Sequence, residues 1–172
     1  MPDTATKILF IAGFGPIDCD VAKSRALYAD SLGIPFKQDA GEYLHTSALE
    51  GAKHFALWPL SQAAQSCFGT DSWPDNLPVP QAWLEFEVDN VEHATADLES
   101  RGYQMLIRNK TKPWGQTVSR FLFPEGLLVA VTFRSIAALN EERSLDAKQQ
   151  DAIVCGVSIL RVQFWTLAVG GR

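Results

Sequence analysis

Residues 83–94 read Trp83-Leu84-Glu85-Phe86-Glu87-Val88-Asp89-Asn90-Val91-Glu92-His93-Ala94. In the first half of this stretch, apolar and charged side chains alternate, which is the pattern of a β-strand with one buried face. Asn90 then precedes residues with helical spacing, and asparagine is a preferred N-cap residue. The stretch therefore predicts a strand over 82–88 that leads directly into a helix over 91–101, which Gly102 ends.

Three more strands follow this helix. We predict strands over 104–108 and 117–122, and a last strand over 127–133 after the turn Phe123-Pro124-Glu125-Gly126. The unit is therefore one strand, one helix and three strands, a βαβββ module.

An earlier and weaker copy of the same unit begins at Ile8. Its predicted elements are a strand over 8–14, a helix over 21–32 between Asp20 and Gly33, strands over 43–48 and 54–58, and a short helix over 60–68. Alignment of the two helix caps, Asp20 and Asn90, gives a repeat period of 70 residues. This period indicates a duplicated unit, and because one module cannot bury both faces of its sheet, we expect the two copies to pair.

The predicted fold class is α+β, with two paired βαβββ modules that form a curved, mixed, mostly antiparallel sheet around a cleft. The predicted boundaries are a first module over 1–68, a proline-containing linker over 69–80, a second module over 81–134 and a C-terminal extension over 135–172, with a polar helix followed by an apolar segment.

Composition narrows the class of protein. The chain has 172 residues, 47% of them hydrophobic and 20% charged, which is ordinary for a soluble globular protein. Its net charge of −5 argues against a nucleic-acid partner. The apolar segment 152–169 contains Arg161 and is not expected to span a membrane. Cys19, Cys67 and Cys155 form no disulfide pattern, so we expect a cytoplasmic protein.

Several motifs occur in a recognisable order. They are Asp20-Val21 with Ser24, Tyr28 and Leu32-Gly33, then Phe86-Glu87-Val88-Asp89-Asn90-Val91, then Pro113-Trp114-Gly115, and finally Phe123-Pro124-Glu125-Gly126. Together they resemble the vicinal oxygen chelate superfamily, which includes glyoxalase I, extradiol dioxygenases, fosfomycin-resistance enzymes and bleomycin-resistance proteins. The resemblance covers residues 7–134. It implies paired modules and, in the family's enzymes, a divalent metal held by His and Glu at four matched positions.

The resemblance places those four positions at Gly13, Trp83, Ala130 and Phe55. None of these side chains carries a donor atom for a divalent cation. A register shift of one residue would bring His54 to the position in the first module, but a single imidazole does not make a metal site. We therefore expect no metal and no other cofactor.

The alternation of side chains in the strand over 82–88 indicates a role in ligand binding for this part of the chain. Trp83, Glu85 and Glu87 share one face, while the apolar side chains of the other face pack under the helix. Aromatic planes beside carboxylates suit a planar or cationic organic ligand. The alternative is that the tryptophans are packing residues and the glutamates are solvated. The predicted ligand-binding residues are Trp83, Glu85, Glu87, Trp114, Trp58, Leu128 and Ala130.

The predicted function is a metal-independent binding protein that sequesters a hydrophobic or cationic organic molecule without converting it, as in drug resistance of the bleomycin-resistance type. The alternative is a metal-dependent lyase, isomerase or dioxygenase of the same superfamily with a relocated metal site at His54, Glu85 and Glu87. A third hypothesis is a regulatory module that acts through its extension. The resemblance implies a homodimer, in which the apolar extension is either an additional interface or folds back onto its own sheet.

Overall fold

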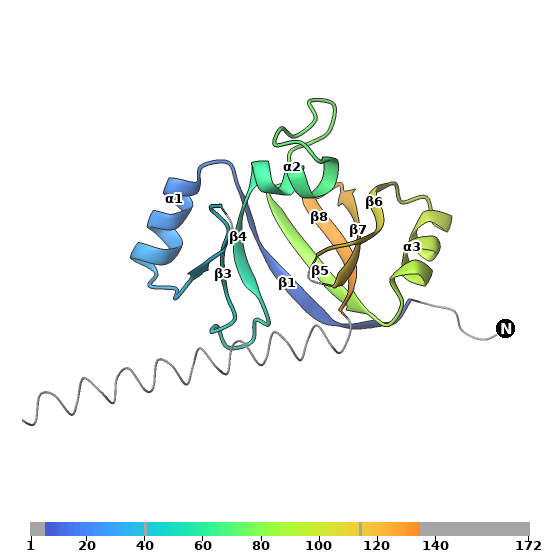
Figure 1. The fold of residues 1–172 in the computed structure, drawn as a ribbon, viewed down its shortest axis with the longest axis horizontal. Helices are drawn as coiled ribbons and strands as arrows, with labels where there is room; N and C mark the ends of the chain where they lie inside the picture. The colour runs from blue at the N-terminus through green and yellow to red at the C-terminus, as the bar shows by residue number, and fades with distance from the viewer. Residues whose placement is uncertain (1–5, 40, 114, 135–172) are drawn as a thin grey trace, which may run out of the picture. The chain divides into compact units, whose positions relative to one another are not determined.

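The computed structural model describes residues 6–39, 41–113 and 115–134, which form one sheet with helices on both faces (Figure 1). In chain order the elements are β1 (Ile8–Asp18), α1 (Val21–Arg25), the π-helical segment η1 (Ala26–Ser31), β2 (Lys37–Gln38), β3 (Leu44–Thr46), β4 (Phe55–Pro59), α2 (Leu60–Phe68), β5 (Ala82–Val88), α3 (Val91–Ser100), β6 (Met105–Thr111), β7 (Gln116–Phe123) and β8 (Leu127–Arg134). The strand order in the sheet is β2-β3-β4-β1-β5-β8-β7-β6.

The two modules are joined through their first strands. β1 and β5 pair antiparallel and lie side by side in the middle of the sheet (Figure 1). Within each module the first and last strands pair in parallel, β1 with β4 and β5 with β8. The pairs β2–β3, β3–β4 and β6–β7 are antiparallel. The predicted α+β fold with two paired modules and a mixed sheet is confirmed.

Helices α1 and α3 lie at opposite ends of the sheet and cover one face, which we call the outer face (Figure 1). Under α3, Val88 and Val131 of the sheet pack against Val91 and Ala94 of the helix. These four residues are fully or almost fully buried, and such burial contributes about 1.5–3 kcal/mol for each large aliphatic side chain. The apolar face of β5 therefore meets its helix as the alternation predicted, although only at the Val88 end.

Helix α2 covers the opposite face, which we call the inner face. Its buried residues Ala63, Ala64 and Cys67 pack against four sheet residues in the largest core cluster, and these are Ile17, Ala56, Trp83 and Leu128. The small side chains of α2 allow the helix to lie close to the strands. Trp73, in the segment predicted as a linker, joins this cluster and donates its indole N–H to the carbonyl oxygen of Pro78 at 3.2 Å.

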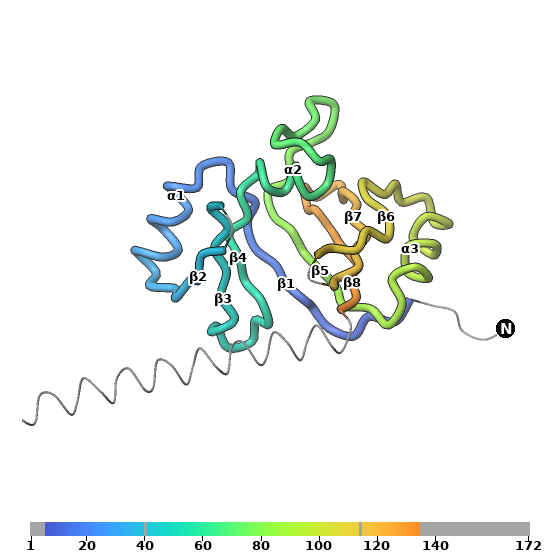
Figure 2. The backbone as a smooth tube through the Cα atoms, viewed as in Figure 1, coloured from blue at the N-terminus to red at the C-terminus, as the bar shows by residue number. Residues whose placement is uncertain are grey.

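Three features of the first module differ from the prediction. β1 continues to Asp18, the helix changes to π-helical geometry at Ala26, and β2 was not predicted. Figure 2 shows β2 beside β3 at the edge of the sheet. β2 consists of two exposed residues, so it has no alternation from which to predict a strand. In the helix, the N–H of Leu32 bonds to the carbonyl of Leu27, five residues back, which defines the wider turn.

Gly15 sets the distance between β1 and β4. A Cβ atom at this position would lie 1.9 Å from the carbonyl oxygen of Ala56, which is backbone and cannot rotate away. Only glycine therefore permits this close approach of the two parallel strands.

The predicted C-terminal extension over 135–172 lies outside the described residues. Within the described part of the chain, no helix is long and apolar enough to cross a bilayer.

Removal of the α3 cap tests the strand–helix junction. The Asn90 side chain accepts a hydrogen bond from the N–H of His93 at 2.9 Å. We expect Asn90→Ala to lower the free energy of unfolding by about 1 kcal/mol, because an N–H at the helix end loses its partner. Asn90→Asp keeps an acceptor and should restore most of the loss. Urea denaturation of the three proteins measures this, and equal midpoints for the alanine and aspartate variants would contradict it.

Candidate functional site

Trp83, Glu85 and Glu87 share the inner face of β5, as the alternation predicted. They lie beside three residues of β8 in parallel register, which are Leu128, Ala130 and Thr132. The six side chains form one continuous patch, but the two glutamates are buried, with no more than 8% of either residue exposed. A buried carboxylate needs a partner, so the surroundings of the patch decide its chemistry.

The last strand of the first module presents aromatic side chains to this patch. The ring centroid of Trp58 lies 5.7 Å from that of Trp83 in edge-to-face geometry, and the His54 ring lies 6.2 Å away. Phe55 points to the outer face, where its ring is 5.5 Å from Phe14. The placement of Phe55 at an inner metal-ligand position was therefore wrong by one residue. The side chains on the inner face of this segment belong to the alternate residues, His54, which the shifted register named, and Ala56, which packs in the α2 cluster.

A tryptophan ring occupies the inner face beside Gly13. A Cβ atom on Gly13 would lie 2.7 Å from Cη2 of Trp83 and 2.9 Å from Cζ3. The resemblance assigns a metal ligand to one position on the first strand of each module. In this chain these positions are Gly13 and Trp83, and the indole of Trp83 lies over Gly13. Gly13, Trp83, Ala56 and Ala130 supply no donor atom for a cation. His54 lies on the same face beside Gly13, but a single imidazole does not make a metal site.

The relocated metal site of the alternative function is also not assembled. In the described ranges, no group of three or more His, Cys, Asp and Glu side chains is placed to hold a metal ion, and this includes His54, Glu85 and Glu87. His54 instead belongs to a stack of rings. Its Nε2 lies 2.9 Å from the hydroxyl of Tyr43, and its centroid lies 5.2 Å from that of His45.

Glu85 is neutralised from within the protein. Nη2 of Arg120 and Nε2 of Gln116 donate to its Oε1 at 3.3 and 3.4 Å, and all three residues are buried. The Arg120 guanidinium also lies 4.9 Å above the ring of Trp58. Stacking on an aromatic face and pairing with a carboxylate are both favourable for arginine. The patch therefore does not present Glu85 as an open counterion.

Two further residues complete a polar cluster under α2. The hydroxyl of Ser66 accepts hydrogen bonds from Nη1 of Arg120 at 2.8 Å and from Nζ of Lys112 at 2.7 Å. Burial, followed by the nearby positive charges of Arg120 and Lys110, lowers the pKa of Lys112 to about 8. Burial also raises the pKa of the Cys67 thiol, although Arg120 and Lys112 act in the opposite direction. Cys67 is therefore a protonated packing residue at neutral pH.

The sequence interpretation missed Arg120, Lys112 and Ser66. One signal was present, because Arg120 is the one charged residue in the strand over 116–123. A charge within an otherwise uncharged strand indicates a paired, buried group. Lys112 and Ser66 carried no comparable signal. Trp114, a predicted ligand-binding residue, lies outside the described residues.

Trp83 has a donor without a partner. Among the described residues, no acceptor lies within hydrogen-bond distance of its Nε1, although this atom is buried. Buried indole N–H groups almost always find a partner. The Trp83 N–H is therefore an unpaired buried donor among the described residues.

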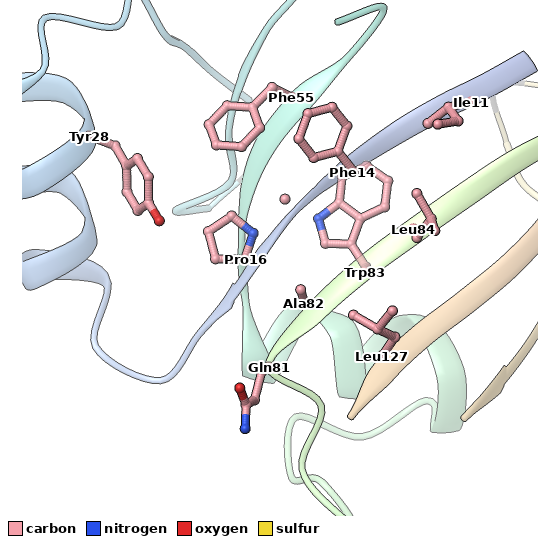
Figure 3. Close-up of a pocket in the computed structure, with 11 residues that line it drawn as sticks. Ile11, Phe14, Pro16, Tyr28, Phe55, Gln81, Ala82, Trp83, Leu84 and Leu127 are labelled. Atoms are coloured by element: carbon pink, nitrogen blue, oxygen red, sulfur yellow. The ribbon is translucent and has the colours of Figure 1, made fainter. Parts of the chain in front are cut away.

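The outer face carries an apolar groove of about 630 Å³ between η1 and the central strands (Figure 3). Phe14, Phe55 and Leu84 line its floor, and Tyr28 of η1 lines one side. Trp83 is also among the lining residues. Ile11, which also lines it, is 51% exposed. This groove was not predicted, because the outer side chains of β5 were expected to lie under the helix.

The fold and the inner face define a class of protein. Two βαβββ modules joined through their first strands, with four matched inner positions on β1, β4, β5 and β8, are the arrangement of the vicinal oxygen chelate superfamily. The sequence profile of the glyoxalase-like domain matches residues 16–134. The chain belongs to this glyoxalase-like family.

The solved structures found to be similar to this chain have little sequence in common with it. One is described as an NAD-dependent benzaldehyde dehydrogenase from Legionella pneumophila, with 10% identity, a TM-score of 0.50, and coverage of 72% of this chain and 98% of that one. A glyoxalase/bleomycin resistance protein/dioxygenase superfamily member from Vibrio splendidus 12B01 is 13% identical, with a TM-score of 0.47 and coverage of 75% and 99%. Streptomyces coelicolor methylmalonyl-CoA epimerase is 14% identical, with a TM-score of 0.47 and coverage of 76% and 97%. Among curated proteins no match was found.

The buried ion pair can be tested by removing its cation. We expect Arg120→Met to lower the free energy of unfolding by about 3–5 kcal/mol, because Glu85 then stays buried without a counterion. The double variant Arg120→Met/Glu85→Gln should recover much of this loss. Urea denaturation measures both.

The pair Arg101–Asp97, in which the arginine is exposed and the Nε to Oδ1 distance is 3.0 Å, provides the matched control. Arg101→Met should change the free energy of unfolding by no more than about 1 kcal/mol. Equal losses of unfolding free energy for Arg120→Met and Arg101→Met would contradict the expected effect of burial on the Arg120–Glu85 pair.

Proposed function

We propose that this protein binds a small organic molecule on the inner face of the sheet and needs no metal ion to do so. The observation that carries the proposal is the Trp83 indole. It lies over Gly13, in the part of the inner face to which the resemblance assigns a metal, and its buried N–H has no acceptor among the described residues. An aromatic plane with a directed donor is a typical element of a ligand site.

The neighbouring rings support an aromatic ligand. Trp58 meets Trp83 edge-to-face, and His54 and Tyr43 continue the aromatic surface through a hydrogen bond of 2.9 Å. Because Glu85 is paired with Arg120, a neutral or acidic aromatic compound fits these surroundings better than the cationic one considered from the sequence. Binding without conversion would sequester the compound, and sequestration of a toxic compound is the way in which such a protein confers drug resistance.

A panel of aromatic compounds in neutral, acidic and cationic forms tests this proposal by thermal shift and by tryptophan fluorescence. We expect a neutral or acidic member to stabilise the full chain. Trp83→Phe should weaken its affinity about five- to tenfold, because one hydrogen bond contributes about 1 kcal/mol. Trp73→Phe is the matched control, since this indole lies in the same cluster but has Pro78 as its acceptor.

Equal affinities of the Trp83→Phe and Trp73→Phe variants would contradict the role of the Trp83 donor. The metal-dependent alternative is tested separately by elemental analysis of protein purified without a histidine tag. Stoichiometric zinc, nickel, manganese or iron would replace the proposal by that alternative.

We also propose that the protein forms a homodimer through the outer groove. The groove is apolar, and Ile11 and Phe14 on its floor are 51% and 40% exposed. An apolar surface of this kind marks an interface in a soluble protein. In a two-fold dimer a second copy presents the same surface in return, so the exposed apolar side chains of the two grooves would cover one another.

Light scattering after gel filtration tests this interface. We expect the wild-type protein to be a dimer and Ile11→Lys to be a monomer with an unchanged far-UV spectrum, because a lysine in the interface is desolvated without a partner. Leu32→Lys is the control, since Leu32 is 60% exposed but does not line the groove. A monomeric wild type, or equal effects of the two lysines, would overturn the assignment.

A further inference from the structure

Two cations converge on one neutral oxygen under α2. Nζ of Lys112 and Nη1 of Arg120 both donate to Oγ of Ser66, at 2.7 and 2.8 Å. Nζ also donates to the backbone oxygen of Ser66 at 3.3 Å. Both cationic residues are buried, with 8% and 5% of their surfaces exposed. A hydroxyl group is a weak counterpart for two positive charges, because it carries no charge of its own.

The surroundings do not balance these charges. The groups that act on the Lys112 ammonium are Arg120 and Lys110, which disfavour its protonated form, and Cys67 and Glu85, which favour it. Glu85 is already paired with Arg120, and the Cys67 thiol is neutral. The sequence of α2, Leu-Ser-Gln-Ala-Ala-Gln-Ser-Cys-Phe, contains no charged residue. Among the described residues that act on Lys112, positive charge therefore exceeds negative charge, in a position where a buried charge is normally compensated.

We propose that Lys112 and Arg120 form a binding site for an oxyanion, a carboxylate or phosphoryl group, whose oxygen takes the place of the Ser66 hydroxyl between the two cations. Arg120 also links this site to the aromatic surface, because its guanidinium lies 4.9 Å above Trp58. The oxyanion is thus the acidic group of the aromatic ligand, an identification that rests on the proposed function. The oxyanion site formed by Lys112 and Arg120 is argued from the geometry of the cluster alone.

Binding of an anion would have two electrostatic consequences. It would supply the charge that the cluster lacks, so that charge-assisted hydrogen bonds replace the two bonds to a neutral hydroxyl. It would also favour the protonated form of Lys112 and raise its pKa above the value of about 8. Affinity for the anion should therefore fall as the pH rises through 8 and the ammonium loses its proton.

The test uses the full chain and three probes at constant ionic strength with chloride as reference. The probes are inorganic phosphate, acetate and benzoate, and the readouts are the melting temperature and calorimetric affinity. At about one hundred times the dissociation constant, we expect a probe to raise the melting temperature of the wild type by about 5 °C or more. Benzoate should bind more tightly than acetate, because its ring reaches the aromatic surface.

Lys112→Met is the decisive variant. It should weaken each probe at least about tenfold, since half of the cation pair is lost. It should not lower the stability without anion, because a desolvated charge has been replaced by an apolar chain of similar length. Lys110→Met, on the exposed end of β6, is the matched control and should retain affinity. Ser66→Ala should also retain affinity, since the anion replaces the hydroxyl.

The pH profile gives an independent readout. Without anion, the stability of the wild type should rise relative to that of Lys112→Met between pH 8 and 10.5, because the amine loses its proton earlier in the folded state than in the unfolded state. A flat difference, or equal probe affinities in the Lys112→Met and Lys110→Met variants, would overturn the anion site.

The two proposals can fail separately. If phosphate binding depends on Lys112 but no aromatic compound responds to Trp83→Phe, the anion site stands and the proposed function does not. If neutral aromatic compounds bind through Trp83 but no oxyanion stabilises the wild type, the proposed function stands and the anion site is wrong. A benzoate affinity that responds to both variants supports an acidic aromatic ligand that spans the two sites.

Discussion

The antiparallel pairing of β1 with β5 is the constraint on which the rest of the structure depends. It places Gly13 beside Glu85 and Gly15 beside Trp83, so that the large ring of one module lies against the smallest residues of the other. A side chain at Gly13 would displace the ring, and one at Gly15 would separate β1 from β4. The contact of Trp83 with the aromatic residues of the first module thus follows from two glycines in its opening strand.

The inner face shows how a shared fold can support a different kind of site. Where the resemblance assigns metal ligands, this chain has alanine, glycine and tryptophan. Its buried cationic side chains are instead on β7 and at the residue after β6. Arg120 and Lys112 lie there under a helix that carries no charge of its own. Desolvation strengthens each electrostatic interaction in such a place and raises the free-energy cost of each group that lacks a partner. At such a place a ligand can be recognised by its charge, without coordination to a metal ion.

The regular parts of the fold were predictable from the sequence because short-range physics determines them. The alternation around Glu85 gave the inner face of β5, and Asn90 marked the start of α3. The Phe55 assignment failed because a shift of one residue moves a strand side chain to the other face, and the register of β8 cannot be transferred to β4 without knowing where each strand pairs. The cluster around Ser66 was not predictable, since its hydrogen bonds join residues 46 and 54 positions apart that meet only after α2 has packed.

The first helix is held more loosely than its counterpart in the second module. Neither α1 nor η1 contains a buried residue, whereas α3 buries Val91, Ala94 and Thr95. Few buried contacts mean a small free energy for local opening, well below that of global unfolding. Amide hydrogens of the first helix should therefore exchange with solvent while the sheet remains intact. Since Tyr28 belongs to this segment and lines the outer groove, the groove has one fixed wall and one that fluctuates.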